Sequence, residues 1–298
     1  MLPLNASQPQ RRQRGNIESN QTFTLTGNTR PSLVRARDQG EAGPALPLIG
    51  ITLHFALSAA QLADQQQLQK QQLTRRTSQY HKWLTPEQYG DRFGVNSADL
   101  EQISTWLARE GFSDIEIARS RTAVSFSGNA AQVQAAFRTS IHHYLVNGES
   151  HYASAGDPEL PKALQGMVAG ISGLDDMRPK PRVRPHLTSS SNGNHYLLPD
   201  DFATIYDIQP LYGKGLDGSN SAIAIVGQSD INLSDIEAFR THIGLPQNDP
   251  RIILTGPDPG TNSGSEGEAD LDIEWAGGIA RNAVIVYVNS TNAFHSLY

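Results

Sequence analysis

Residues 222–226 read AIAIV and residues 283–288 read AVIVYV, two continuous apolar runs rich in β-branched side chains. Such runs are typical of strands that are buried on both faces in a parallel sheet. Between them lie a helical pattern over Leu233–Ile243, a short strand over Ile252–Leu254 and a second helical pattern over Glu266–Ala280. This alternation of strand and helix predicts a doubly wound α/β sheet in the C-terminal part of the chain.

The part of the chain before these runs has a different order of elements. We expect strands and helices in the order Ile51–Phe55 (strand), 58–76, 85–93 and 96–110 (helices), Ile115–Ala118 and Ala123–Phe126 (strands), Ala130–Phe137 (helix) and Ser140–Val146 (strand). Asn147-Gly148 is a hairpin turn signal and leads into one more strand. The order predicts an α+β domain of the ferredoxin-like, split βαβ kind.

Two segments are too polar to build a core. Residues 1–22 are rich in Gln, Asn, Ser and Arg and predict a disordered arm. Residues 179–196 contain prolines, basic residues and a Ser/Gly/Asn tract, and predict an exposed, cleavable linker. The remaining residues form a first domain over 23–178 and a second over 197–298. Three parallel strands make a poor sheet by themselves, so we expect the second domain to be truncated.

Composition excludes several functional classes. The chain has 298 residues and no Cys, which excludes disulfides, Cys-ligated metal and a cysteine nucleophile. Residues 199–298 carry a net charge of −10 and the rest +4, and no basic helix is interleaved with aromatics, so we expect no nucleic-acid partner. The apolar run at 46–57 (LPLIGITLHFAL) is too short to span a membrane and favours a buried strand over a secretory signal. No signal peptide is visible near residue 1.

The acidic stretch SEGEADLDIEW at 265–275 holds the candidate site. Glu268 and Asp272 are four residues apart, so they lie on one side of the expected helix, together with Trp275. A carboxylate pair on an apolar side is unusual, because like charges repel and burial adds to the cost. The other acids are expected to face solvent: Glu266, Asp270 and Glu274. From this segment alone, a capped, acidic helix start without chemistry is the favoured interpretation.

Other candidate residues carry weaker signals. Asp230 follows the first parallel strand, where open α/β sheets place ligands, but such a residue is more often part of a turn. The nine His show no metal-binding spacing, and His142-His143 would point to opposite faces of one strand. The glycines at 213–218 (GKGLDG) lack the preceding strand that a phosphate-binding loop needs.

Ordered motifs along the chain resemble one family. The motifs that resemble the pro-kumamolisin activation domain are YHKWLTPEQYGDRF at 80–93, residues 106–111, VSFSG at 124–128 with 133–137, and GISGLD at 170–175. Those that resemble the opening of the catalytic domain of the sedolisins, the serine-carboxyl peptidases, are LLPDDFATIY at 197–206, residues 222–230 and EADLD at 268–272.

This resemblance implies a subtilisin-like fold for the second domain and a Glu–Asp–Ser catalytic set. Glu268 would be the general base and Asp272 would orient it. A glutamate remains partly ionised at an acidity that protonates histidine, so the implied enzyme works in acid. The resemblance further implies a peptide or protein substrate, an activation domain that packs on the peptidase domain, and an extracellular location. It also implies a calcium ion, whose site in the full-length proteins of the family lies in a region that is absent from this chain.

The sequence also departs from the family pattern. The Gly-Thr-Ser-like nucleophile motif and the oxyanion-hole Asp of the family are not found in it, and Gly227 stands where some members carry an additional acid. We therefore expect the propeptide and the start of a secreted, acid-active serine endopeptidase, inactive as this chain. One alternative is a stand-alone inhibitor or folding module made of residues 46–178, and another is a product that does not fold beyond the linker.

Overall fold

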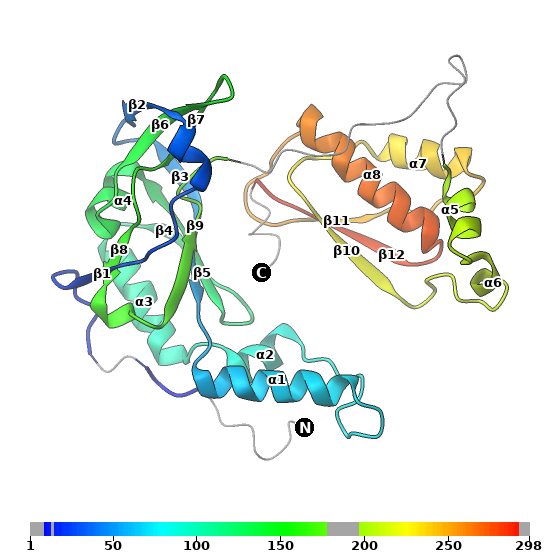
Figure 1. Ribbon diagram of the computed structural model, residues 1–298, viewed down its shortest axis with the longest axis horizontal. Helices are drawn as coiled ribbons and strands as arrows, with labels where there is room; N and C mark the ends of the chain where they lie inside the picture. The colour runs from blue at the N-terminus through cyan, green and yellow to red at the C-terminus, as the bar shows by residue number, and fades with distance from the viewer. Residues whose placement is uncertain (1–8, 13–14, 178–196, 292–298) are drawn as a thin grey trace. The chain divides into compact units, whose positions relative to one another are not determined.

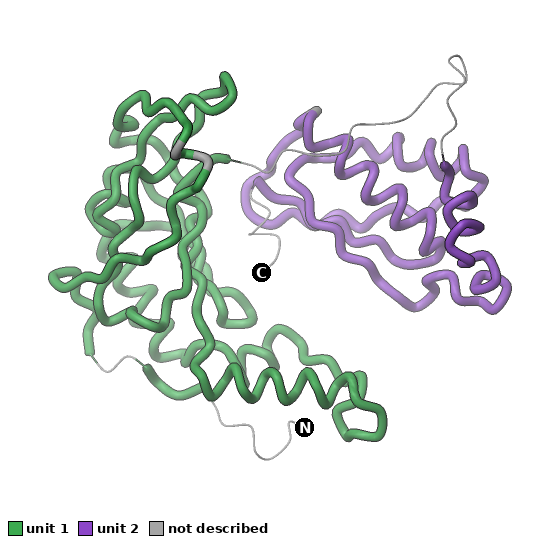
Figure 2. Tube along the Cα trace, viewed as in Figure 1, with its two compact units in different colours: residues 1–177, 298 green, residues 178–297 purple. Residues whose placement is uncertain are grey.

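The computed structural model describes residues 9–12, 15–177 and 197–291. These residues form two compact units, of which the first ends at Met177 and the second holds the remainder (Figure 2). The predicted linker over 179–196 lies outside the described residues. Within the described ranges, no helix combines the length and the apolar character that crossing a membrane would require.

The first unit is built on a four-stranded antiparallel sheet in the order β4-β5-β3-β9 (Figure 1). Two helices pack their apolar sides on this sheet and contribute to its core. The elements are β3 (Pro47–Phe55), β4 (Ser113–Ile117), β5 (Ala123–Asn129), β9 (Val168–Ser172), α3 (Ser97–Arg109) and α4 (Ala130–Phe137). The predicted α+β class is thus confirmed.

Two smaller sheets complete the first unit. One is antiparallel in the order β2-β6-β7, and the other is the pair β1-β8. The predicted hairpin turn joins β6 to β7, with Asn147 at φ 54° and Gly148 at φ 86°, the left-handed conformation that such a turn requires. The strands are β1 (Thr22–Thr24), β2 (Arg37–Glu41), β6 (Ile141–Val146), β7 (Glu149–Ser154) and β8 (Glu159–Pro161), and the short 3₁₀ turns are η1 (Pro31–Arg35) and η2 (Lys162–Leu164).

The helix starts follow the local signals in the sequence. Ser58 caps α1 (Ala59–Leu73) and Thr85 caps α2 (Pro86–Phe93). In each case the side chain of the glutamine three residues later accepts a hydrogen bond from the backbone N–H of the capping residue. Asn96 caps α3 through its side-chain oxygen alone, which accepts from the N–H of Ala98 at 2.9 Å. These starts confirm what the capping residues predict.

The predicted disordered arm is wrong for residues 9–12 and 15–22. Arg12 donates from its backbone N–H to Asp99 Oδ2 at 2.7 Å and from its guanidinium to the carbonyl of Ala56 at 2.7 Å. Ile17 is only 2% exposed and belongs to the core, and its carbonyl accepts from Arg109. A polar segment stays disordered when no folded surface binds it. Here the folded domain binds the segment through the buried carboxylate of Asp99 and through the apolar core that takes up Ile17.

The second unit contains a three-stranded parallel sheet in the order β10-β12-β11. This confirms helices and parallel strands in alternation after residue 197, although the strand that is last in the chain lies in the middle of the sheet. The elements are α5 (Pro199–Ile205), α6 (Gln209–Tyr212), β10 (Ala222–Gly227), α7 (Leu233–His242), β11 (Arg251–Leu254), α8 (Ser263–Ile279) and β12 (Val284–Asn289).

Helices α7 and α8 lie on one face of this sheet rather than on both (Figure 1). Ile236 of α7 and Ile273 of α8 share one core cluster with Tyr287 of β12, and Arg240 of α7 donates to the carbonyl of Gly277 on α8 at 3.0 Å. The doubly wound prediction is therefore wrong for the described residues. Because β12 lies between β10 and β11, two helices on one face require the two connections to have opposite hands, against the usual preference for right-handed crossovers.

Candidate active site

Helix α8 carries the acidic residues of the candidate site. Its first turn is capped by Asn262, whose Oδ1 accepts from the N–H of Gly264 at 3.1 Å. The helix thus starts three residues before the predicted position, because the cap precedes the glycine and serine run. Glu266 lies in the first turn, where the positive end of the helix dipole favours a carboxylate.

Glu268 and Asp272 lie one turn apart on the same side of α8, as predicted. Glu268 is half-buried, and its Oε2 is shielded from solvent and bonds to no described residue. Asp272 is more exposed, although partial burial raises its pKa. No hydrogen bond joins the two carboxylates in the described part of the chain, so the structure aligns them without coupling them.

The pair lies at the border of the buried side of α8, not at its centre. The residues that face the sheet are Ala269 and Ile273. Trp275 lies at the same border and packs edge-on against Phe202 of α5, with 5.9 Å between the ring centroids. A side chain at this border can reach both the apolar interior and solvent, which suits a group that exchanges protons.

Asp270 and Glu274, which we expected to face solvent, are half-buried instead. Burial, Glu266 and Asp235 of α7 raise the pKa of Asp270 to about 6. Burial, Asp270 and Asp235 raise the pKa of Glu274 to about 7. Sequence spacing on α8 could not reveal this, because the like charge of Asp235 comes from a neighbouring helix.

Asp230 ties together the carboxyl ends of the strands. Its Oδ1 accepts from Asn289 Nδ2 at the end of β12 at 2.7 Å, and its N–H donates to Gly260 in the loop before α8 at 2.9 Å. Burial and the nearby Asp258 raise its pKa. These bonds give Asp230 a structural role in the described residues, in line with a turn residue.

Tyr287 closes the polar end of the core. Its Oη donates to the carbonyl of Ser229 at 2.7 Å, and burial above all raises the pKa of this phenol to about 12. A Cβ at Gly227 would lie 1.9 Å from that Oη. Position 227 therefore has no room for the additional acid of some sedolisins as long as Tyr287 keeps this position.

In the ranges that the structure describes, no three His, Asp or Glu side chains converge to hold an ion.

Comparison with known proteins gives both units a context. Residues 36–177 match the pro-kumamolisin activation domain. The chain is 29% identical over 274 residues to sedolisin of Pseudomonas sp. (strain 101), an alignment that covers 85% of this chain and 44% of that protein. The chain is a relative of the sedolisins. It is also 27% identical to xanthomonalisin of Xanthomonas sp. (strain T-22), over 72% of this chain and 27% of that protein.

Kumamolisin of Bacillus sp. (strain MN-32) is a third relative, 26% identical over 70% of this chain and 40% of its own length. The chain thus spans less than half the length of each of these three proteins. Because the activation-domain match ends at residue 177, an alignment over 85% of the chain must extend well into the second unit. The chain therefore corresponds to the propeptide and N-terminal region of a sedolisin-like peptidase.

Proposed function

We propose that this chain is the activation domain and the start of the peptidase domain of a secreted, acid-active serine endopeptidase that is made as a zymogen. The observation that carries the proposal is the order of the matches, with an activation domain over 36–177 followed by similarity to sedolisin in the second unit. A peptide or protein substrate, an activation domain that packs on the peptidase domain and an extracellular location belong to this proposal.

The detailed fold is part of the same proposal. The strand order β4-β5-β3-β9, with α4 between β5 and β9, supports a ferredoxin-like split βαβ in the first unit. The parallel order β10-β12-β11 with both helices on one face supports an unusual α/β topology, which we propose to be the start of a subtilisin-like domain.

In the proposed chemistry, Glu268 acts as the general base and Asp272 orients it. The half-buried Glu268 has an oxygen that bonds to no described residue, so it is free to accept the proton of a serine hydroxyl supplied by the rest of the peptidase domain. A glutamate in this role sets an acidic working range.

The 298-residue chain itself should not hydrolyse peptides, because a base without its nucleophile forms no acyl-enzyme. The test is incubation of the purified chain with a peptide library at pH 3 to 6. No turnover is expected. Turnover that disappears in Glu268→Ala would contradict the proposed division of the catalytic set.

A second candidate function is an inhibitor or folding module for a complete sedolisin-type peptidase. The first unit favours it, because its core is separate from that of the second unit and closes around Trp106, which is fully buried. The full chain is added to a mature, already folded sedolisin-type peptidase at neutral pH. It is expected to bind that enzyme and to slow its hydrolysis of a peptide substrate. Failure to bind would remove this candidate.

A further inference from the structure

The tip of the α1–α2 pair, residues 70–83, carries a concentration of positive charge. From residue 65 to residue 86 the sequence holds no Asp or Glu. The same stretch holds four cationic side chains, all of them exposed: Lys70, Arg75, Arg76 and Lys82. Figure 1 shows the end of α1 and the loop that follows it projecting from the sheets of the first unit. Four cations and no acid thus give this projection a net charge of +4.

The acids that flank the tip on α1 and α2 do not neutralise it. Each of them is already paired with an arginine outside the tip. The pairs are Asp64 with Arg92 at 2.6 Å, Glu87 with Arg119 at 2.5 Å, and Asp91 with Arg121 at 2.6 Å. Within the described ranges, no ion pair engages a cation of the tip, so these charges are available to an anionic partner.

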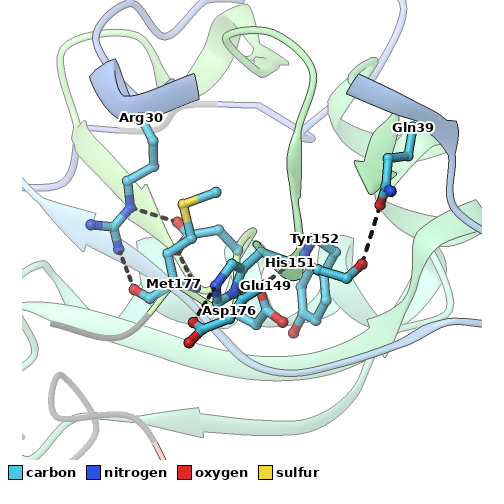
Figure 3. A network of polar contacts seen from close by, with 9 residues as sticks. Arg30, Gln39, Glu149, His151, Tyr152, Asp176 and Met177 are labelled. Carbon is cyan, nitrogen blue, oxygen red and sulfur yellow. Dashed lines mark hydrogen bonds and ion pairs between the residues drawn. The ribbon is translucent and has the colours of Figure 1, made fainter. Parts of the chain in front are cut away.

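The polar network at the end of the first unit shows the opposite arrangement. Figure 3 shows His151 between two carboxylates, with its Nδ1 3.2 Å from Asp176 Oδ1 and its Nε2 3.5 Å from Glu149 Oε2. Arg30 Nε in the same network donates to Asp175 Oδ2 at 3.0 Å. Basic groups there are satisfied within the protein, and this contrast sets the tip apart.

Two large apolar side chains are exposed at the same tip. Leu73, the last residue of α1, is 71% exposed, and Trp83 is 64% exposed. The ring of Trp83 is stacked with that of His81, with 6.2 Å between the centroids, and its indole N–H donates to no described residue. An exposed indole among cationic side chains is typical of surfaces that lie at the boundary between water and lipid headgroups.

Buried contacts of Gln72 hold the loop of the tip in one shape. Gln72 is 5% exposed, and its Nε2 donates to the carbonyl of Lys82 at 2.5 Å. Its own carbonyl accepts from the N–H of His81 at 3.0 Å. Because the loop is ordered without a partner, binding through it costs less conformational entropy than binding through a disordered segment.

We propose that the tip, residues 70–83, binds the surface of a membrane that contains anionic lipids. Its four cations face the lipid phosphates, while Leu73 and Trp83 enter the headgroup layer. A projecting loop can sink apolar side chains into a fluid lipid surface, whereas a protein partner would need a hollow shaped to receive them. The tip belongs to the first unit and takes no part in the proposed peptidase chemistry, so this inference goes beyond the proposed function.

Vesicle binding by the full chain near neutral pH tests the proposal. Vesicles of phosphatidylcholine alone are compared, by co-sedimentation, with vesicles that also contain about 30% phosphatidylglycerol. Affinity for the anionic vesicles should be at least about tenfold higher and should fall as the salt concentration rises from about 0.05 M to about 0.5 M. Tryptophan emission should move to shorter wavelength with the anionic vesicles, and this shift should be absent in Trp83→Phe.

Two double variants with the same change in charge separate the tip from the charge of the whole chain. Arg75→Gln with Arg76→Gln should weaken binding to the anionic vesicles about 30-fold, because each cation near such a surface contributes about fivefold. Arg35→Gln with Arg37→Gln removes two exposed cations beside β2, which Figure 1 places at the other end of the first unit from α1. This control should change binding by less than about twofold.

Three results would overturn the proposal. Equal binding to both kinds of vesicle would show that anionic lipid is not recognised. Equal losses in the two double variants would show that the tip is not the binding surface. Absence of binding to either kind of vesicle would exclude lipid and leave an acidic protein surface as the alternative occupant.

Discussion

The two units treat their charged side chains in opposite ways. In the first unit, carboxylates face cations: Arg92 Nη2 lies 2.6 Å from Asp64 Oδ1, and Arg11 Nε lies 3.7 Å from Oδ1 of the buried Asp99. In the second unit Arg281 pairs with Asp200, but the carboxylates of α8 face other carboxylates, as Glu274 does with Asp270 and Asp235. A carboxylate paired with a cation contributes stability that is lost when acid protonates it, whereas clustered acids favour the protonated state. The comparison predicts that acid lowers the stability of the first unit and raises that of the second.

The largest expected effect is a loss of stability in the first unit alone. Trp106 is fully buried between α3 and the sheet, and its indole donates to Ser19 and to Glu110 at 3.1 Å each. Trp106→Ala should lower the free energy of unfolding of the first unit by about 3–5 kcal/mol. Chemical denaturation followed by circular dichroism measures it, and the protection of the α8 amides from hydrogen exchange in denaturant reports on the second unit. An equal shift of the α8 transition would show that the units do not unfold separately.

A smaller loss of stability is expected in the second unit when Gly227 is replaced. In Gly227→Ala the new Cβ would clash with Tyr287 Oη, so the bond from Tyr287 to Ser229 is lost or β10 moves. We expect a loss of about 2–3 kcal/mol in the same denaturation experiment. Gly267→Ala on α8 is the matched control, because nothing lies within 4 Å of its Cβ and alanine favours a helix by about 1 kcal/mol. A neutral Gly227→Ala would contradict the tight contact.

A still smaller effect is expected in the pH dependence of the stability of the second unit. The folded-state pKa values of Asp270 and Glu274 are raised to about 6 and about 7, so the native second unit holds protons that the unfolded chain releases. Its stability is therefore full below about pH 4 and falls as pH rises to about 7, by roughly 1–2 kcal/mol after solvent screening. Glu274→Gln should flatten this slope and raise stability at pH 7. Thermal unfolding at pH 4 and pH 7 measures both; a second unit that is more stable at pH 7 would contradict the cluster.

Local features of the fold could be predicted from the sequence. Thr85, Asn96 and Asn147-Gly148 act through neighbours in the chain, and the helices and the hairpin begin and turn where these residues indicate. The pairing of β1 with β8 and the burial of Ile17 depend on residues far along the chain, and no local pattern contains that information.

The candidate site divides in the same way. The four-residue spacing placed Glu268 and Asp272 on one side of α8, because helix geometry alone decides it. The burial of Asp270 beside Asp235 could not be foreseen, since it depends on α7 and α8 sharing one face of the sheet. That arrangement requires one of the two connections between parallel strands to be left-handed. Nearly all such connections are right-handed, so the sequence pattern does not lead one to expect it.

The most direct test of the central claim is peptide hydrolysis at pH 4 by the protein expressed from the complete reading frame that encodes this chain. Glu268→Gln should lower kcat by about 10³-fold or more, because it removes the proposed base while keeping size and shape. Glu266→Gln, on another side of the same helix, is the control and should stay within about threefold. Full activity in Glu268→Gln, or an equal loss in both variants, would contradict the assignment of Glu268 as the base.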